Sequence, residues 1–206
     1  MRYFLDIETS NVDISDLSFD NPKGWEISCI CVVSEENEIY TFSDVRDELF
    51  EEAIFRHRID NEPDFIWNNR PLSHFHQFIE HLMWDDEHIL ITKNGAKFDI
   101  PIIEEYLEVS LEGLLNHYDI EKHIMDESGE RYRLSELIHY HIGKEEGKLL
   151  EAKYAPTLWS QGYYEVVVGY CIDDCYKTMK VYDDAKMRGF YSAIDRNGME
   201  LEKVLF

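Results

Sequence analysis

Arg2-Tyr-Phe-Leu-Asp-Ile-Glu-Thr-Ser10 is a short apolar stretch that predicts a strand and carries Asp6 and Glu8 two positions apart. Residues two apart in a strand point to the same face of the sheet, so we expect the two carboxylates side by side. Two negative charges on a buried strand are unfavourable unless a positive group lies between them, and a divalent cation would supply that charge. The alternative is a solvated strand end, and the rest of the chain has to decide between the two.

The composition is that of a folded domain with an acidic surface. The chain has 206 residues, 44% hydrophobic and 14% aromatic, which fits one domain with a sizeable core. The formal net charge of -23 argues against the basic surface that is usual in nucleic-acid-binding proteins. Bound divalent ions can cancel several acidic charges locally, and a subset of basic residues can cluster while the remaining surface stays acidic.

The cysteines and the hydropathy pattern indicate a protein of the reducing cytoplasm. The cysteines are Cys29, Cys31, Cys171 and Cys175, and neither pair has the Cys-x-x-Cys spacing or the histidines of a structural zinc site. We expect free, mostly buried thiols. The sequence shows no targeting signal and no apolar run near the roughly eighteen residues that span a bilayer, so we expect no membrane partner.

The order of predicted elements indicates a sheet with helices. Trp25–Val33 and Glu38–Phe42 predict two strands joined by a polar turn, which with the opening stretch gives an antiparallel meander. Further strands are predicted over Glu87–Thr92 and Tyr118–Met125, and helices over Ser73–Trp84, from Pro101 onward, over Leu134–Ile142 and over Tyr163–Arg188. We expect a single domain over 1–206, with an insertion at about 46–71 that includes a short helix near Glu48–Phe55, an irregular stretch over Leu149–Gln161 and a C-terminal hairpin at about 190–206.

Acidic residues recur where the predicted strands and helices meet. Asp99 lies between a predicted strand and the start of the next helix, and Asp174 lies in the last long helix, four residues after Tyr170. Ligands of sheet-and-helix domains bind at strand ends and helix starts, so Asp99 can meet Asp6 and Glu8 at one edge of the sheet. Asp174 joins them if the long helix packs across that edge, and Tyr170 then faces the same point.

Three short motifs span most of the chain. They are Asp6-Ile-Glu8-Thr9, then Asn94-Gly-Ala-Lys-Phe98-Asp99, and then Tyr170-Cys-Ile-Asp-Asp174. With these motifs, in this order, the chain resembles the DEDDy exonucleases, the 3′-to-5′ nucleases of the ribonuclease H-like superfamily that include polymerase proofreading domains. The stretch Tyr132–Thr178 looks most like stand-alone relatives of the family-B polymerase exonucleases.

Two departures from the family pattern bear on the subtype. Many members have His before the Asn of the second motif, whereas Thr92 and Lys93 stand there in this chain. Asp173 is next to Asp174, but only Asp174 has a tyrosine four positions earlier, because Gly169 stands four before Asp173. The tyrosine subtype is therefore favoured.

The resemblance implies an α/β fold with a ribonuclease H-like mixed sheet, in which the first three strands are antiparallel and the later strands parallel, flanked by helices. It implies two divalent ions, and ligands that are all oxygen atoms favour Mg²⁺ or Mn²⁺. Asp6, Glu8 and Asp174 would hold the ion that activates water, and Asp6 with Asp99 the ion near the leaving group. Tyr170 would orient the attacking water.

The resemblance also implies substrate contacts. Thr9 would touch the terminal nucleotide, and Asn94 and Phe98 are candidates for the same role, although Phe98 suits core packing at least as well as stacking. Lys93, Lys97, Lys177 and Lys180 flank the motifs and could meet phosphates, although solvated charges are the commoner role of lysines.

The implied function is a metal-dependent 3′-to-5′ exonuclease that hydrolyses single-stranded nucleic acid from its 3′ end, DNA favoured over RNA, to nucleoside 5′-monophosphates by a two-metal mechanism, in DNA repair or replication. The alternative, which the acidic composition favours, is a catalytically weak exonuclease-like binding module or a subunit of a polymerase or helicase assembly. A metal-dependent phosphatase is a third class, but it leaves the three-motif pattern unexplained. The sequence does not define the oligomeric state.

Overall fold

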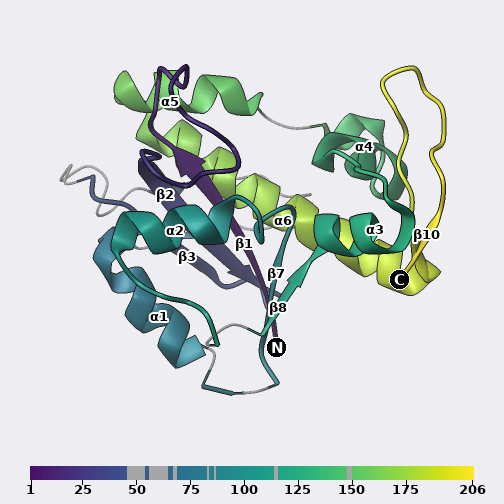
Figure 1. Ribbon diagram of the computed structural model, residues 1–206, viewed down its shortest axis with the longest axis horizontal. Helices are drawn as coiled ribbons and strands as arrows, with labels where there is room; N and C mark the ends of the chain where they lie inside the picture. The colour runs from purple at the N-terminus through teal and green to yellow at the C-terminus, as the bar shows by residue number, and fades with distance from the viewer. Residues whose placement is uncertain are drawn as a thin grey trace.

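A mixed six-stranded sheet forms the centre of the structure (Figure 1). The computed structural model describes residues 1–45, 54–55, 65–66, 69–82, 84–85, 87–113, 116–147 and 150–206. The sheet has the strand order β6-β3-β2-β1-β7-β8 and consists of β1 (Arg2–Thr9), β2 (Ile27–Ser34), β3 (Ile39–Phe42), β6 (Asn69–Arg70), β7 (Ile89–Thr92) and β8 (His117–Asp119). The first three strands are antiparallel, while β7 runs parallel to β1 and β8 parallel to β7. The predicted α/β fold class is thus confirmed.

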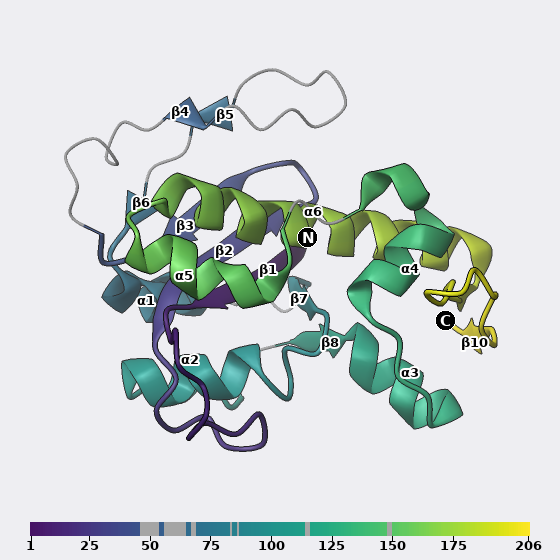
Figure 2. The same ribbon diagram turned by 90° about the horizontal axis from the view of Figure 1, so that it is seen from above.

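Helices cover both faces of this sheet. Figure 2 shows α1 (Phe75–Leu82) and α2 (Asp99–Leu107) on one side, and α5 (Ala155–Ser160) and α6 (Tyr164–Arg188) on the other. The long α6 crosses β1 and β2, and Gly189, at φ 81°, ends it in the left-handed conformation that glycine adopts without steric cost. The spacing of apolar residues thus predicts α6 to within one residue at its start.

Strand β1 divides the interior into two cores by simple alternation. Tyr3, Leu5 and Ile7 pack into the core beneath α1 and α2. Phe4 points the other way, into the core shared with α6. Because side chains alternate along a strand, Asp6 and Glu8 lie on the same face as Phe4 and therefore face α6.

The remaining elements lie beside the sheet or at one end of it. They are β4 (Ile54–Phe55), β5 (Phe65–Ile66), α3 (Ile120–Ser128), α4 (Leu134–His141), β9 (Phe190–Tyr191), β10 (Val204–Leu205) and three short 3₁₀ helices, η1 (Leu72–His74), η2 (Lys144–Glu146) and η3 (Ala152–Tyr154). Strands β9 and β10 pair antiparallel. Most of the predicted insertion at 46–71 lies outside the described residues, and Ile54–Phe55, within the possible helix at Glu48–Phe55, form a strand.

Two predictions of secondary structure are wrong. The strand expected over Tyr118–Met125 ends at Asp119, because the Asp119 side chain accepts the N–H of Lys122 at 3.0 Å and caps α3. The stretch Leu149–Gln161, expected to be irregular, contains η3 and α5, and Pro156 lies in the first turn of α5, where its missing N–H removes no intrahelical bond. Because η3 and α5 are short, the helical spacing of their apolar residues is hard to recognise in the sequence.

Two further observations concern the cysteines and the possibility of a membrane-spanning helix. The four cysteines are free and buried. Within the described residues, no helix is both long enough and apolar enough to cross a membrane.

His141 connects α4 to α6 and to the C-terminal segment. Its Nδ1 lies 2.8 Å from Asp184 Oδ2, and its Nε2 accepts the backbone N–H of Ser192 at 3.1 Å. Because Nε2 accepts, the proton of the neutral ring is on Nδ1 and is donated to Asp184. Burial lowers the pKa of His141 below the usual 6.5, although Asp184 opposes this shift. The folded protein therefore holds the neutral ring.

We expect neutral His141 to make stability depend on pH. Below about pH 6.5 the unfolded chain takes up this proton before the folded chain does, so the stabilising contribution is present above that pH and is lost as the pH falls. His141→Asn retains a donor for Asp184 but has no such titration. The difference in unfolding free energy between wild type and variant, from urea unfolding, should therefore be smaller at about pH 5.5 than at about pH 7.5. A difference that grows at the lower pH would contradict this assignment.

Candidate metal centre

Two carboxylates leave β1 side by side and meet a third from α6. Oxygen atoms of Asp6, Glu8 and Asp174 lie within 4.8 Å of one another. Glu8 and Asp174 are buried and Asp6 is half-buried. Strand β1 is paired with β2 along almost its whole length, which fixes the first two carboxylates while the packing of α6 fixes the third. Acidic residues far apart in the sequence thus form one group.

Asp99 reaches the same place from the start of α2. Its Oδ1 accepts the backbone N–H of Ile7 at 3.1 Å. This N–H is available because β7 pairs with β1 only from Arg2 to Phe4. Asp99 is not one of the three carboxylates that lie within 4.8 Å of one another. Burial raises the pKa of Asp99 to about 7, and the charge of Asp119 adds to this shift.

Tyr170 lies against the acidic group and holds its proton. Its side chain is buried and hydrogen-bonds to Asp174. Burial, and next the charges of Asp174, Glu8 and Asp6, raise the pKa of Tyr170 well above the usual 10. A neutral phenol in this position can orient a polar molecule, but it is not a base near neutral pH.

The two neighbouring aspartates of α6 have different surroundings. Asp173 forms an ion pair with Lys177, one turn further along the helix, and the Lys177 Nζ also donates to the carbonyl oxygen of Gly147 at 2.8 Å. Asp174 is the one that lies with Asp6 and Glu8. This placement agrees with the position of Tyr170 four residues before Asp174.

All the site residues that the sequence predicts line one cleft of about 620 Å³. They are Asp6, Glu8, Thr9, Asn94, Phe98, Asp99, Tyr170 and Asp174. The cleft also has aromatic residues that sequence reasoning missed, because their role depends on contacts between distant segments. The ring of Phe98 lies 5.2 Å from Trp25 and 5.7 Å from Phe19, centroid to centroid, and Phe19 is 61% exposed. Phe98 therefore belongs to an aromatic wall and also packs beside the core.

The loop that carries the second motif is held by Asp119, which sequence reasoning also missed. This buried carboxylate accepts the N–H of Asn94 at 3.1 Å, the N–H of Ala96 at 2.6 Å and the hydroxyl of Thr92 at 3.1 Å. The backbone passes close to Thr92 at Gly95, where an added Cβ would lie 2.5 Å from the Thr92 side chain. This approach requires glycine. The only sequence signal for Asp119 is its position as a cap before α3.

The lysines that flank the motifs are engaged with carboxylates. Lys93 Nζ lies 2.6 Å from Glu121, and Lys97 Nζ lies 2.7 Å from Asp20. Lys180 lies 4.0 Å from Glu146, and Lys177 pairs with Asp173. Of these four, only Lys93 lines the cleft.

The donor set fits a hard divalent cation. Ligand oxygens around Mg²⁺ lie about 2.1 Å from the ion and so about 3 to 4 Å from one another, a spacing that the three carboxylates, all within 4.8 Å of one another, can adopt. With no nitrogen or sulfur among these donors, Mg²⁺ or Mn²⁺ suits the group better than zinc does. A bound ion would also remove the repulsion between three close carboxylates.

Comparison with known proteins identifies the family. A family model of the RNase H superfamily matches residues 3–186, so this chain belongs to that superfamily. In fold the chain is similar to the family B DNA polymerase from the hyperthermophilic archaeon Pyrobaculum calidifontis, with a TM-score of 0.59 and 15% sequence identity over 90% of this chain. The chain spans 24% of the length of that polymerase. A search of curated proteins found no match.

We expect Asp119→Asn to destabilise the protein by about 2 kcal/mol or more, because the amide NH₂ cannot accept the N–H donors of the loop and leaves them buried without a charged acceptor. Urea unfolding measures the effect. Asp126→Asn on α3, the helix that Asp119 caps, is the control, since Asp126 forms an exposed pair with Lys122 and its replacement should leave stability near the wild-type value. Equal effects of the two substitutions would show that Asp119 does not support the loop.

Proposed function

We propose that this chain is a metal-dependent 3′-to-5′ exonuclease of the DEDDy type that hydrolyses single-stranded nucleic acid, DNA in preference to RNA, to nucleoside 5′-monophosphates. The observation that carries the proposal is that Asp6, Glu8 and Asp174 converge in the cleft that also contains Asp99 and Tyr170. Membership of the RNase H superfamily supports it. A binding module would have no need to keep these acidic side chains together, because they repel one another without an ion.

In this mechanism Asp6, Glu8 and Asp174 would hold one Mg²⁺ or Mn²⁺ ion, and Asp6 with Asp99 a second. When bound, the ions supply charge neutralisation at the scissile phosphate and Lewis acidity toward the attacking water. Asp6 would serve both positions: its carboxylate lies with that of Asp174, and Asp99 binds the backbone N–H of Ile7, the next residue along β1. The protein contributes a fixed set of carboxylates and needs little rearrangement.

Tyr170 orients the attacking water through its neutral phenol. Its raised pKa excludes a role as a base at neutral pH, since the hydroxyl stays protonated. A phenol can both donate and accept a hydrogen bond. Tyr170 can therefore donate to Asp174, which holds the phenol in place, and accept from the attacking water, which orients the lone pair of that water. Loss of such positioning costs a rate about 10²-fold.

The aromatic wall of the cleft supports an unpaired substrate. The exposed Phe19 and the half-buried Phe98, backed by the buried Trp25, present rings against which a base can stack, and stacking tolerates every base because each has a π-face. A base within a duplex is already stacked on its neighbours, so a frayed or single-stranded 3′ end is the better substrate. Thr9 and Asn94 line the same cleft, which supports a role for them in contacting the terminal nucleotide.

The acidic composition remains the argument for a second candidate, a catalytically weak module within a polymerase or helicase assembly. The net charge is -23, and the lysines near the motifs are paired with carboxylates. A partner protein would then supply most of the affinity for nucleic acid. This candidate predicts binding or assembly without cleavage.

We expect the purified protein to shorten 5′-labelled single-stranded DNA from its 3′ end with Mg²⁺ or Mn²⁺, to release nucleoside 5′-monophosphates, to act more slowly on RNA, and to stop with EDTA. Asp6→Ala and Asp174→Ala should lower the rate by roughly 10³-fold, because each removes a carboxylate that holds an ion. Tyr170→Phe should lower the rate by about 10²-fold. Gel analysis of the ladder and chromatography of the products measure these effects.

Asp173→Asn and Asp174→Asn form a matched pair for this assay, because they are adjacent buried aspartates on one helix. Only the second should abolish cleavage. Equal activity of wild type and Asp174→Asn would refute the enzyme, and complex formation without a ladder would favour the binding module. Turnover of a chromogenic phosphoester without a ladder would instead indicate a phosphatase.

We expect Mg²⁺ to raise the melting temperature more at about pH 8 than at about pH 6. Burial raises the pKa of Asp99 in the folded protein to about 7, above the usual 3.8. In the ion-free protein this carboxyl is therefore mostly protonated at about pH 6 and mostly ionised at about pH 8, where its buried charge is unfavourable. The ion binds the ionised form and so gains affinity over the same range. Thermal unfolding with and without MgCl₂, at matched ionic strength, measures the shift.

Asp99→Asn is the control for this pH dependence. It retains the group of three carboxylates, so Mg²⁺ should still raise the melting temperature, but by nearly the same amount at both pH values. If the wild type also shows the same shift at both pH values, Asp99 does not bind the ion.

A further inference from the structure

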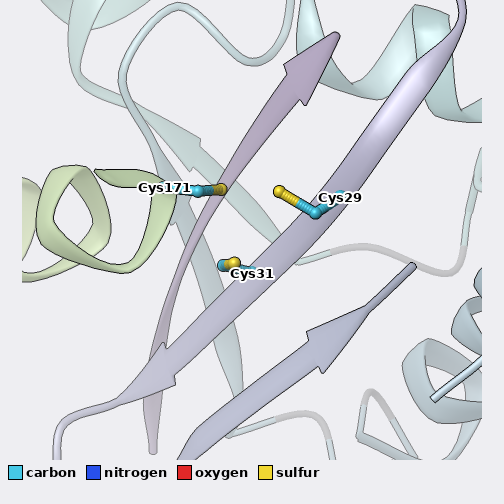
Figure 3. Close-up of side chains that lie close together, drawn as sticks. All are labelled: Cys29, Cys31 and Cys171. Carbon is cyan, nitrogen blue, oxygen red and sulfur yellow. The ribbon is translucent and has the colours of Figure 1, made fainter. Parts of the chain in front are cut away.

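The four cysteines of the chain converge between β2 and α6. Cys29 and Cys31 lie two apart on β2, and Cys171 and Cys175 lie one turn apart on α6. The sulfur atoms of Cys29, Cys31 and Cys171 all lie within 4.8 Å of one another, and all three residues are fully buried. Figure 3 shows Cys29 and Cys171 pointing toward one another from the two elements, with Cys31 beside them.

The three thiols are free, and their proximity allows them to coordinate one metal ion. A Zn–S bond of about 2.3 Å places ligand sulfurs about 3.8 Å apart in a tetrahedral site and about 4.0 Å apart in a trigonal one. All three sulfur atoms lie within 4.8 Å of one another, so side-chain adjustments can bring them to these separations. A disulfide would require an S–S distance of about 2.05 Å.

Thiolate ligands also define the chemical class of the ion. Sulfur donors select soft cations such as Zn²⁺ and Cu⁺ and discriminate against Mg²⁺ and Mn²⁺. Three thiolates leave one negative charge on a Zn²⁺ site and two on a Cu⁺ site, and a buried site disfavours the larger charge. Zn²⁺ is therefore the better match, although its fourth coordination position would need another ligand.

We propose that Cys29, Cys31 and Cys171 bind one soft cation, preferentially Zn²⁺, which joins β2 to α6. Binding would release thiol protons to solvent. The fold, not the sequence spacing, assembles this site, because two ligands come from a strand and the third from a distant helix. The proposal requires no nuclease activity.

The site lies beside the acidic group, on the face of the sheet that α6 covers. In the register of β1 with β2, Asp6 pairs with Cys31 and Glu8 pairs with Cys29. Without an ion, the Cys171 thiol donates to the carbonyl oxygen of Asp6 at 3.3 Å, and a metal-bound thiolate would no longer donate there. Occupancy by the soft cation would thus fix the separation between β2 and α6 and change a contact to the backbone of Asp6.

Cys175 is the matched control. It is as buried as the other three, lies on the same helix, and its thiol donates to the carbonyl oxygen of Cys31 at 3.4 Å, but it is not one of the three mutually close sulfurs. Cys175→Ser therefore removes a buried thiol of the same interface without removing a proposed ligand. Cys171→Ser and Cys29→Ser each remove one.

The test measures metal content and spectra of the whole chain, reduced and kept under anaerobic conditions. The protein is incubated with Zn²⁺ or Cu⁺ in excess Mg²⁺, which occupies the carboxylates, and is then freed of unbound metal. Elemental analysis should find about one Zn²⁺ per chain in the wild type and in Cys175→Ser, whereas Cys171→Ser and Cys29→Ser should bind at least about 100-fold more weakly. Cd²⁺ should give a thiolate charge-transfer band in the ultraviolet only with proteins in which all three ligand cysteines are intact, the wild type among them.

Each outcome decides the proposal. No uptake of Zn²⁺ or Cu⁺ by the folded wild type would overturn it, as would uptake that Asp174→Ala abolishes and Cys171→Ser retains, because that places the metal at the carboxylates. Uptake of Cu⁺ but not Zn²⁺ would retain the site and overturn the preference. Two ligand variants are used so that failure of one to fold leaves the other. Loss of nuclease activity in Asp6→Ala with normal Zn²⁺ uptake would separate this site from the proposed active site.

Discussion

The strict alternation of side chains along β1 is the constraint on which the site depends. A central strand between two apolar layers has to send every second residue into each layer, and Phe4 shows which face belongs to α6. Asp6 and Glu8 fall on that face and so meet the helix that carries Asp174. Shifting β1 by one residue would place both carboxylates in the opposite core. The apolar packing that stabilises the fold thus also selects the residues that converge.

Support for the cleft comes from groups that take no part in binding an ion. Asp119 holds the loop that leads to Asp99, through two backbone N–H groups and one hydroxyl. Tyr170 hydrogen-bonds to Asp174. Such contacts keep carboxylates in place that would otherwise separate by mutual repulsion. The free energy that folding loses by gathering these charges is therefore offset by hydrogen bonds made next to them and by the cores on both sides of the sheet.

Sequence reasoning predicted the parts of this structure that depend on period and on order along the chain. The alternation in β1 and the long helical spacing of α6 predicted the two elements that carry the acidic group, and the family resemblance of the three motifs implied the mixed sheet. It placed a strand where α3 begins, because Ile120 and Ile124 are too few to reveal a helical period beside the polar residues around them. The aromatic partners of Phe98 and the cysteine group arise from contacts between distant segments, and neither leaves a local spacing.

The end of the pairing between β1 and β7 has a consequence for the origin of the cleft. Parallel pairing stops at Phe4, and a carboxylate of α2 takes the N–H of Ile7 where the next strand would have continued. The cleft thus lies beside the part of β1 that β7 leaves unpaired. A longer β7 would improve the sheet and at the same time occupy the place of Asp99. In this architecture, shortening one strand is a way to create a binding site without adding a residue to the chain.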